Sequence, residues 1–591
     1  MSSTYTGLAA GSLKRVTYSN FRGVDFSGGE VNDSRSPDAL NMWKNYSHLG
    51  KLIETRPGIS QELELDGDVF GLFFYEVNRV KHLIIHAGVK LYDYNLETQA
   101  TPTIIKSSGM KPARSVGFVF NNILFIKDGL KYYEYNGTTI KEVEGYIPNI
   151  AIHNMISGKT EMVQEANLLT DYVKEQYIPD GTKTDFPLSQ REIDNGLEVW
   201  DISNVTPVQI TTGFSVDVVN GVVTFTTAPT AATTATLEFK YSKTSDGRET
   251  ADKCKLACIF DNRVFMSGNE NHPNLLIWTG LNNPRYMANT SYSSLGNDTA
   301  NVKALVPGNN ALWSFKEPSH SNTTIFYSVP YEVYDAKLDQ TIKTYSTSHS
   351  SISTGCKHTG INFNDDIVFL SEYGLEGISS NITTEQVIAH RSSLVDSKLL
   401  KATYEPVLVE WMGYLLICCD NEIFLADSRQ RVQNADHIEY EWFYWKTGES
   451  LDNSNAIESA IVIDNILYLG IRSGKILKLQ EGEYNLVDSY WCTKQDDLGY
   501  PQLLKTTNKK GFKINVENLF ENYNTDIKIE TRLDNKDFEE LATLINTKGY
   551  VVTKIKKKKW TTIQLKFSST IPFGIYEATL ESYIGSYVKR S

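Results

Sequence analysis

Acidic side chains recur at turns along this sequence, and paired carboxylates are groups that could carry out general acid–base catalysis. The candidates are Asp261, Asp365, Asp366 and Asp464. A glycan-cleaving enzyme would need such acids to converge on one cleft. Each of them, however, occupies the turn of a repeated strand–turn–strand pattern, where Asp accepts hydrogen bonds from its own backbone. We therefore interpret these residues as turn formers and not as a catalytic cluster.

Metal-binding residue types also occur, but their spacing does not suit a site. His82 and His86 would share zinc only on a helix. The residues between them favour a strand, which would place the two rings about 13 Å apart. Cys254 and Cys258 lack the further ligands that a structural zinc needs. The segment Asp180–Asp185 resembles a calcium loop without its alternating acids and final Glu, so a plain turn is the better interpretation.

Motifs for covalent catalysis and phosphate binding are absent. The sequence contains neither G-x-S-x-G nor a phosphate-binding loop, and it has no Ser-x-Asp-x-Gly-x-x-Trp box of the sialidase type. One basic run is present, Lys554 to Lys559 followed by Trp560. It could contact DNA or an acidic neighbour, but solvated lysines also protect an exposed strand edge from pairing. We predict no catalytic, cofactor-binding or metal-binding residues, and a protein that is not an enzyme.

The composition favours strands. The 591 residues are 41% hydrophobic and 22% charged, with 33 Tyr and 25 Phe but only 8 Met; aromatic and β-branched residues favour β structure. A net charge of −13 argues against a broad face that binds the phosphates of DNA. Six cysteines are too sparse for a disulfide scaffold. No apolar run suits a signal peptide or a membrane span, so we expect a protein made and folded in a reducing cytoplasm.

A repeated pattern is the strongest structural signal: an apolar strand, a polar turn and a second apolar strand. The clearest copies are Val119–Ile126, Ile259–Met266, Phe363–Leu370 and Val462–Leu469. Weaker copies are Val306–Trp313, Glu410–Ile417 and the residues around Val77–Asn78. A further strand signal usually follows each copy, as in 130–135, 374–378, 422–426 and 474–479. The repeating unit is therefore a meander of about four short strands.

The spacing of the turns predicts the architecture. They lie near residues 78, 122, 262, 310, 365, 413 and 465, and one gap is far longer than the others. When residues 159–245 are set aside, the period becomes about 50 residues, which is typical of a β-propeller. We predict an all-β protein with a β-propeller of about seven blades, with six or eight as alternatives. Unrelated hairpins in a sandwich remain the competing interpretation.

The remaining segments differ in character from the repeat. Residues 159–245 predict an inserted small β domain that begins with a helix over 160–174 and contains a hairpin at Asn220–Gly221. Residues 485–591 predict a C-terminal β-sandwich, and residues 1–60 an extended arm or rim segment. The propeller would then comprise residues 61–158 and 246–484.

Four segments resemble one family, the tail nozzle or stabilisation (tail tubular B-like) proteins of short-tailed bacteriophages. The first runs through Asp25–Glu30 and Ala39–Trp43 to the Arg-Pro-Gly turn that ends at Gly58, and another is Ile367–Gly374. The other two comprise Ile259–Gly268, Asn274–Trp278 and Asn282–Tyr286 in one blade, and Tyr177–Gly181 to Val223–Pro229 in the insert. None of these is a catalytic motif, so the resemblance rests on their joint occurrence in this order.

The resemblance implies a structural virion protein of the phage tail. Such a protein forms a ring, often of six copies, below the portal and adaptor proteins and around the DNA exit channel. It would retain packaged DNA, let double-stranded DNA pass without specific binding, and provide a platform for fibres or spikes. We expect an acidic channel, because DNA adheres where its phosphates are neutralised. The alternatives are a propeller enzyme or lectin that acts on host surface glycans, and a binding propeller that forms no ring.

Overall fold

The computed structural model describes residues 11–48, 52–318, 323–335, 340–350, 352–380, 386–434, 437–448, 455–519, 526–545, 548–555 and 558–587. Within these ranges the chain is almost entirely strand and loop. The helices are α1 (Gly247–Asp252), α2 (Asp396–Leu399) and the 3₁₀ turn η1 (Tyr46–His48). The chain divides into two compact units, residues 1–72, 368–382 and 387–591 in one and residues 73–367 and 383–386 in the other.

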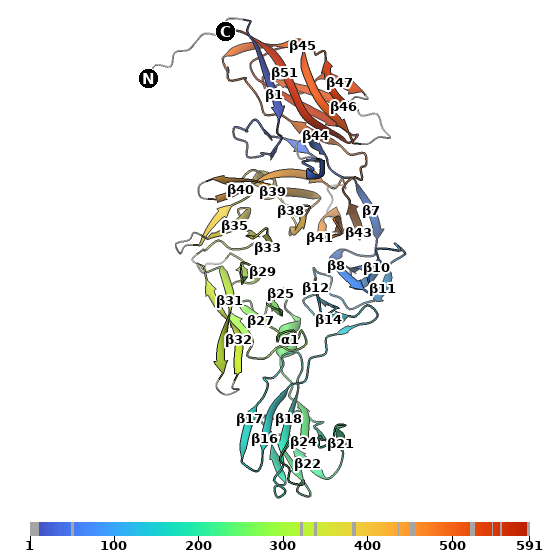
Figure 1. The fold of residues 1–591 in the computed structure, drawn as a ribbon, viewed down its shortest axis with the longest axis vertical. Helices are drawn as coiled ribbons and strands as arrows, with labels where there is room; N and C mark the ends of the chain where they lie inside the picture. The colour runs from blue at the N-terminus through green and yellow to red at the C-terminus, as the bar shows by residue number, and fades with distance from the viewer. Residues whose placement is uncertain are drawn as a thin grey trace, which may run out of the picture. The chain divides into compact units, whose positions relative to one another are not determined.

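Seven sets of four antiparallel strands follow one another along the chain (Figure 1). Six form separate four-stranded sheets, and one, β37–β40, continues into an 11-stranded sheet. The first two sets are β8 (Val69–Val77), β9 (Val80–Ala87), β10 (Lys90–Asn95), β11 (Thr103–Lys106), and β12 (Val116–Phe120), β13 (Ile123–Lys127), β14 (Tyr132–Tyr135), β15 (Ile140–Glu142). The third, fourth and fifth sets are β25 (Leu256–Phe260), β26 (Arg263–Ser267), β27 (Leu275–Trp278), β28 (Tyr292–Ser294); β29 (Val302–Gly308), β30 (Ala311–Lys316), β31 (Ile325–Asp335), β32 (Gln340–His349); and β33 (Gly360–Phe363), β34 (Asp366–Leu370), β35 (Leu375–Ser380), β36 (Gln386–His390). The sixth set is β37 (Val407–Trp411), β38 (Tyr414–Cys419), β39 (Glu422–Asn434), β40 (His437–Lys446), and the seventh is β41 (Ile457–Ile463), β42 (Ile466–Ile471), β43 (Lys475–Leu479) with β7 (Ile59–Glu64).

Each set is one blade of a seven-bladed β-propeller, which confirms the predicted fold class. First strands of successive blades pack on each other: β12 on β25, β25 on β29, β29 on β33, and β37 on β41. Second strands such as β30 and β38 are buried along their whole length, whereas β12 and β37 stay partly exposed. A strand covered on both faces reads as a continuous apolar run, which is why the second strand of each copy was the clearest sequence signal.

The turns between first and second strands explain the repeated Asp and Asn. Asp261 and Asn262 have φ angles of 50° and 55°, and Asp464 and Asn465 have φ angles of 51° and 62°. Two successive left-handed residues define a type I′ hairpin turn, which Asn and Asp tolerate. Asn364–Asp365 adopts the same conformation. The interpretation of these acids as turn residues is therefore confirmed for Asp261, Asp365 and Asp464, but Asp366 lies in β34 and is buried.

The seventh blade is completed by a strand from the other end of the chain. β7 pairs with β43 in antiparallel register, from Ile59 opposite Leu479 to Glu64 opposite Lys475. The outer strand of the last blade therefore precedes the first complete blade in the sequence. Most of β7 lies in the range predicted for the propeller, which begins at residue 61, but the sequence did not indicate its partner, which is more than four hundred residues away in the chain.

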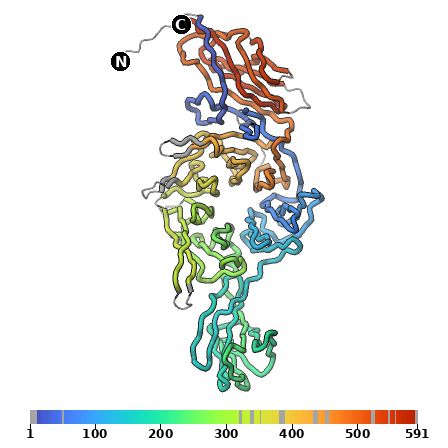
Figure 2. Tube along the Cα trace, in the orientation of Figure 1, coloured from blue at the N-terminus to red at the C-terminus, as the bar shows by residue number. Residues whose placement is uncertain are grey.

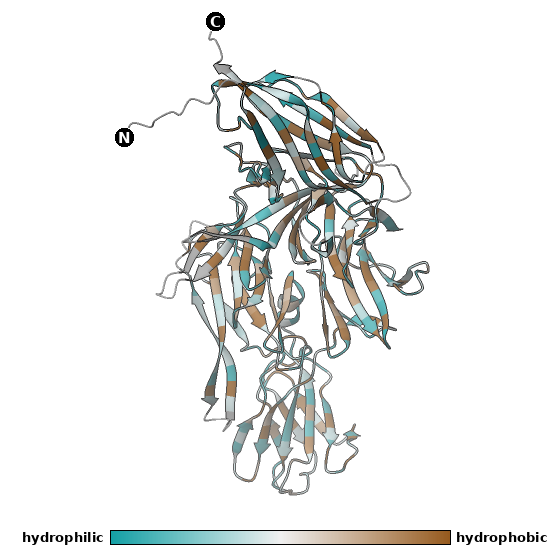
Figure 3. Ribbon diagram, turned by 45° about the horizontal axis from the view of Figure 1, so that its top comes forward, coloured by the Kyte–Doolittle hydropathy of each residue, from teal (hydrophilic) through white to brown (hydrophobic). Residues whose placement is uncertain are grey.

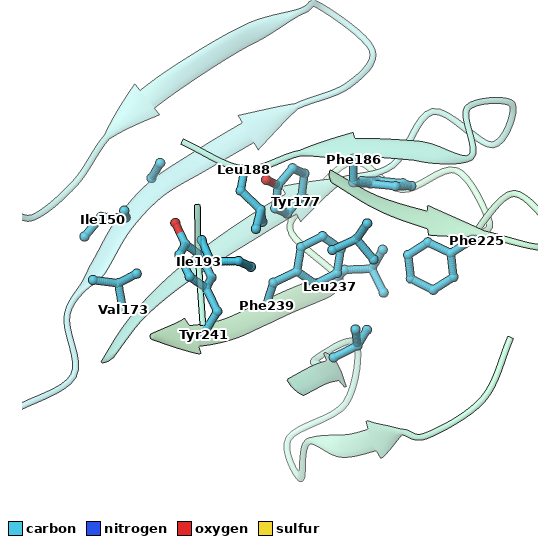
Figure 4. Packing of buried hydrophobic residues seen from close by; sticks show 13 residues of the cluster. Ile150, Val173, Tyr177, Phe186, Leu188, Ile193, Phe225, Leu237, Phe239 and Tyr241 are labelled. Carbon is cyan, nitrogen blue, oxygen red and sulfur yellow. The ribbon is translucent and has the colours of Figure 1, made fainter. Parts of the chain in front are cut away.

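Residues 149–242, here called the module, form two sheets with their own core. The larger sheet has the order β17 (Lys159–Met162), β16 (Asn149–Asn154), β18 (Tyr172–Ile178), β24 (Leu237–Ser242), β20 (Glu198–Asp201), β21 (Val208–Ile210). The smaller has the order β19 (Asp185–Pro187), β23 (Val222–Phe225), β22 (Phe214–Asp217). Figure 4 shows the buried side chains between them, including Tyr177, Phe186, Phe225 and Phe239.

Two expectations for the module change. The helix expected over 160–174 is wrong: β17 and β18 occupy its two ends, and both are strands. Alternation of buried and partly buried residues in β18 marks a sheet with one covered face. The larger sheet also includes β16, which precedes the expected boundary at 159. Between β17 and β18 the chain returns to the propeller, where the Asn167 side-chain amide donates to the carbonyls of Tyr146 at 2.7 Å and Arg285 at 2.8 Å.

The C-terminal strands combine with strands from the N-terminal sixty residues. The 11-stranded sheet contains β1 (Leu13–Ser19), β5 (Met42–Trp43), β6 (Ile53–Thr55), β45 (Leu503–Asn518), β48 (Gly549–Thr553), β49 (Lys559–Trp560) and β51 (Phe573–Tyr587) beside β37–β40. A five-stranded sheet has the order β4 (Ala39–Leu40), β44 (Ser489–Cys492), β50 (Ile563–Ser569), β46 (Asp526–Leu533), β47 (Glu539–Ile545). A short parallel pair, β2 (Gly23–Val24) and β3 (Arg35–Ser36), lies in the same segment.

Figure 2 shows the N-terminal trace in blue beside the red C-terminal strands, where β1 pairs with β51 along its whole length. The two C-terminal sheets pack through side chains such as Phe512 and Phe567, whose ring centroids are 6.5 Å apart. Polar and apolar residues alternate along these strands, as the colours of Figure 3 show. Each strand therefore turns its apolar residues inward and its polar residues outward.

Candidate functional site

The histidines of the H-x-x-x-H spacing have separate partners. Both lie on β9, as the sequence predicted for the residues between them. His82 Nδ1 is 2.6 Å from Asp93 Oδ1, whereas His86 Nδ1 is 2.8 Å from Ser115 Oγ and its Nε2 is 3.1 Å from the Gly88 carbonyl. Burial lowers the pKa of His86 to about 4, so this ring stays neutral. Within the described part of the chain, no group of three or more His, Cys, Asp or Glu side chains is arranged so that it could hold a metal ion.

Cys254, which is buried, and Cys258, which is partly buried, are poor nucleophiles. Burial raises the pKa of Cys254 to about 11 and the pKa of Cys258 to about 12. A thiol reacts as the thiolate, so these shifts suppress reactivity at neutral pH. All six cysteines are free thiols.

Among the turn acids, Asp261 is held by hydrogen bonds from two side chains of β32. Its carboxylate accepts hydrogen bonds from Lys343 Nζ at 2.6 Å and from the Tyr345 hydroxyl at 2.8 Å. Burial raises the pKa of Asp261, but these two hydrogen bonds outweigh it and the net shift of the pKa is downward. This carboxylate fastens β32 to the turn of the preceding blade and stays ionised, so it is unsuited to act as a general acid.

The basic run lies beside the long strand β45. Lys558 Nζ forms an ion pair with Glu539 at 2.6 Å, and Lys559 belongs to β49, which pairs with β45. Lys554 is exposed. Lys556 and Lys557 lie outside the described residues, so the role predicted for the run as a whole stays a prediction.

A polar cluster in the module resembles a catalytic triad in composition. The fully buried carboxylate of Glu175 lies 2.6 Å from His153 Nε2 and accepts hydrogen bonds from the Ser189 backbone N–H at 3.0 Å and from the hydroxyls of Tyr177 and Tyr241. Burial, followed by the charge of Glu175, raises the pKa of both tyrosines, which therefore remain proton donors. The sequence analysis did not single out this cluster, because its members are scattered over β16, β18, β24 and a loop.

The geometry of this cluster is structural. Ser189 Oγ is 3.5 Å from His153 Nε2, the same nitrogen that contacts Glu175. In a nucleophilic triad the hydroxyl and the carboxylate use opposite nitrogens of the ring. Here the other nitrogen, Nδ1, is 2.9 Å from Thr160 Oγ1, and Ser189 Oγ donates to Glu175 at 3.1 Å. The hydroxyl thus has no free base to accept its proton.

A second cluster joins three acid–base groups around His390. Its Nδ1 is 3.0 Å from Glu376 Oε1, and its Nε2 is 2.6 Å from Asp396 Oδ2. Hydrogen bonds with Asp396 and then Glu376 raise the pKa of His390 to about 10. A ring that donates from both nitrogens has no lone pair with which to accept a proton. The cluster joins β35, β36 and α2, and it is a poor general base at neutral pH.

A groove of about 490 Å³ lies on the five-stranded sheet of the C-terminal region. Side chains of β44, β46 and β50 line it, among them Tyr490, Lys528 and Lys566. In the register of the sheet Ser568 stands opposite both Tyr490 and Lys528, so these three side chains share one face. The strand alternation was visible in the sequence, but nothing there indicated that β46 and β50 would be neighbours.

One exposed surface is apolar. β31 pairs with β30 only as far as Ser328, whereas its pairing with β32 continues to Asp335 opposite Gln340. The segment beyond Ser328 is therefore a two-stranded ribbon. Val329, Tyr331 and Val333, here called the ribbon face, alternate along it and are 39%, 45% and 43% exposed.

Comparisons with known proteins identify no family. No family model matches the chain, and no curated protein matches it. Neither helix of the described residues has the length and apolar character to cross a bilayer.

Several solved structures are similar at low sequence identity. BamB from Moraxella catarrhalis is 12% identical with a TM-score of 0.32, and the match covers 72% of this chain and 99% of that one. The Cps50 (Swd1) β-propeller domain from Myceliophteria thermophila is 7% identical with a TM-score of 0.30, over 71% of this chain and 98% of that one. The computationally designed Ika8 protein is 12% identical with a TM-score of 0.31, over 71% and 99%. The propeller assignment rests on the strand order described above.

Proposed function

We propose that this protein is a structural component of a bacteriophage tail, a nozzle or hub ring built from several copies of the chain. The ring, with six copies as the expected number, would surround the DNA exit channel, retain packaged DNA and carry fibres or spikes. The acid and histidine clusters around Glu175 and His390 favour this role over an enzyme, because their hydrogen-bonding groups are already occupied. The assignment to the tail, and the expectation that portal-side adaptor proteins are its neighbours, rest on the family resemblance in the sequence.

The ribbon face is the observation that carries self-assembly. Val329, Tyr331 and Val333 extend beyond the sheet of their own blade and leave three large apolar side chains in water. Exposed apolar patches of this kind mark interaction surfaces. A second copy of the chain is the partner that a ring requires.

Analytical ultracentrifugation and electron microscopy of the purified full chain test the assembly. We expect closed rings with a central channel. Replacing Val329, Tyr331 and Val333 together by Ser should convert the rings to monomers without changing the circular dichroism spectrum. Val208 and Val219, which are 58% and 64% exposed in the module, provide the control when both are replaced by Ser. Rings that survive the ribbon-face change would contradict the role of this surface.

The virion role needs a separate measurement. Mass spectrometry of purified particles and of their isolated tails should detect the chain in stoichiometric amounts. Its absence from particles would overturn the structural assignment. A strongly basic channel in the assembled ring would contradict the expected passage of DNA without adhesion.

A further inference from the structure

The groove on the five-stranded sheet presents ordered rows of polar side chains. The register places Cys492, Lys566 and Glu530 in one row, and Tyr490, Ser568 and Lys528 in the next. Asp526 lies two residues before Lys528 in β46, and Thr570 lies two residues after Ser568, just past the end of β50. All of these residues except Cys492 and Glu530 line the groove. Rows two residues apart are separated by roughly 7 Å, so from Lys566 to Thr570 the groove runs about 14 Å.

Of the two lysines that line the groove, Lys528 has a carboxylate partner and Lys566 has none among the described residues. The Nζ of Lys566 lies 4.1 Å from the ring centroid of Tyr490 and 5.7 Å from that of Phe538. Glu530, which stands opposite Lys566 in the sheet, is instead paired with Lys528 at 2.7 Å. No ion pair joins Lys566 to any carboxylate in the described ranges. A half-buried ammonium held over aromatic rings without an anion is a site for an anionic group of a ligand.

The rest of the lining suits hydroxyl groups. Asp488 and Asp526 supply hydrogen-bond acceptors, and Ser568 and Thr570 supply hydroxyls that donate or accept. Asp488 and Asp526 can accept hydrogen bonds from vicinal hydroxyls of a ligand. The lining therefore combines one anion site with a polyhydroxyl site, and its volume lies in the range of small-molecule pockets, about 300–1,000 Å³.

We propose that this groove binds a saccharide bearing a carboxylate, such as a uronic or sialic acid residue within a short acidic glycan. Lys566 receives the carboxylate, and the row of Ser568 and Thr570 with Asp526 receives the ring hydroxyls. A length of about 14 Å accommodates two to three sugar rings along β50. The inference does not depend on the proposed tail function, since the groove lies within one copy of the chain.

Isothermal titration of the full chain provides the test, with sialyllactose and a uronic acid trisaccharide as probes and lactose as the neutral comparison. We expect binding of an acidic probe with Kd of ~1 mM or tighter, and at least tenfold weaker binding of lactose. Lys566→Gln should weaken binding of the acidic probe by at least tenfold. Lys513, whose Nζ lies 4.2 Å from the Tyr550 ring on the other C-terminal sheet, is the matched control, and Lys513→Gln should leave binding unchanged.

Three results would overturn the proposal. The first is that neither acidic probe binds at several times 1 mM. The second is that both lysine variants lose binding of the acidic probe equally. The third is that inorganic phosphate, at the same concentration as the saccharide, displaces it completely. The last would identify a general anion site. Circular dichroism of Lys566→Gln must match the unaltered chain, and Tyr490→Phe, which keeps the ring under the ammonium, should retain binding. Saccharide binding by a chain that forms no rings would support the groove while contradicting the proposed assembly.

Discussion

The module and the C-terminal sheets are both all-β, but they are assembled from the sequence in different ways. Every strand of the module lies within residues 149–242, and most of its pairs join strands close in the chain. The C-terminal sheets take β1, β4, β5 and β6 from the first sixty residues and pair them with strands beyond residue 430. The module thus carries its own core, whereas the C-terminal sheets are complete only when both ends of the chain are present.

This difference predicts where damage spreads. Long-range strand pairing adds loop-closure entropy to the cost of folding, and losing one partner leaves an open sheet edge. Changes in the N-terminal strands should therefore destabilise a large cooperative unit. Changes in the module should remain local.

The largest expected effect comes from removing residues 1–64. This deletion takes away β1 and β4–β7, so the seventh blade and both C-terminal sheets lose strands. We expect an aggregated product without a cooperative thermal transition.

Excision of residues 172–242 is the matched comparison. Tyr172 pairs with Ser242, and the Lys243 N–H donates to the Asp171 carbonyl at 3.1 Å, so a two-residue linker can join the cut ends. We expect this variant to retain a cooperative transition in differential scanning calorimetry. Aggregation of both variants would erase the distinction between the two regions.

A smaller but substantial loss is expected from Glu441→Ala. Glu441 is fully buried in β40, and Arg35 bonds both of its carboxylate oxygens at 2.8 and 2.9 Å. Removing one partner of a buried ion pair leaves the other charge unpaired, so the free energy of unfolding should fall by about 3–5 kcal/mol. Chemical denaturation measures this change. The exposed pair of Arg15 and Glu581 serves as the control, and Arg15→Ala should cost no more than about 1 kcal/mol.

Tyr241→Phe tests whether damage in the module stays local. The change removes a donor from the buried Glu175 carboxylate, which should cost about 1.5–3 kcal/mol. Hydrogen exchange should accelerate in β16, β18 and β24 and remain unchanged in β45 and β51. Tyr172→Phe, at an exposed position of β18, should alter neither region. Faster exchange in β45 would show that the regions are coupled.

The last expected effect is a pH dependence centred on His390. Its pKa is raised from 6.5 to about 10 by Asp396 and Glu376, so the folded state binds this proton more tightly than the unfolded state. The stabilisation is fully present below pH 6.5 and is lost as the pH rises toward 10. Thermal melts of the unaltered chain should therefore lose more stability between these pH values than melts of His390→Gln. Parallel pH profiles for both proteins would rule out this contribution.

The residues show why some features were predictable and others were not. The propeller blades were visible because each buried second strand and its Asn or Asp turn, such as Asp464–Asn465, lie within about ten residues of one another. The partners of β7 and β1, which are β43 and β51, were not predicted because these pairings are defined only by the tertiary fold. The helix expected over 160–174 is wrong because β18 alternates buried and partly buried residues with the two-residue period of a strand.

The polar clusters and the groove were hard to predict for the same reason, because their residues come together only in the folded chain. His390 and Glu376 come from one blade, but nothing in their spacing indicates that both nitrogens of the ring are occupied. The groove requires β44, β46 and β50 to be neighbours, and strand order within a sheet is not encoded in any local pattern. Asp261, Asp365 and Asp464 were interpreted correctly as turn residues because their conformation is a local property.

The pairing of β1 with β51 has a consequence for synthesis of the chain. The ribosome makes Leu13 long before its partner Tyr583. At about 5–20 residues per second, β1 waits roughly half a minute to two minutes for β51. β7 likewise waits for β43. During this interval both strands carry unpaired backbone groups, which can pair with a neighbouring chain unless a chaperone covers them.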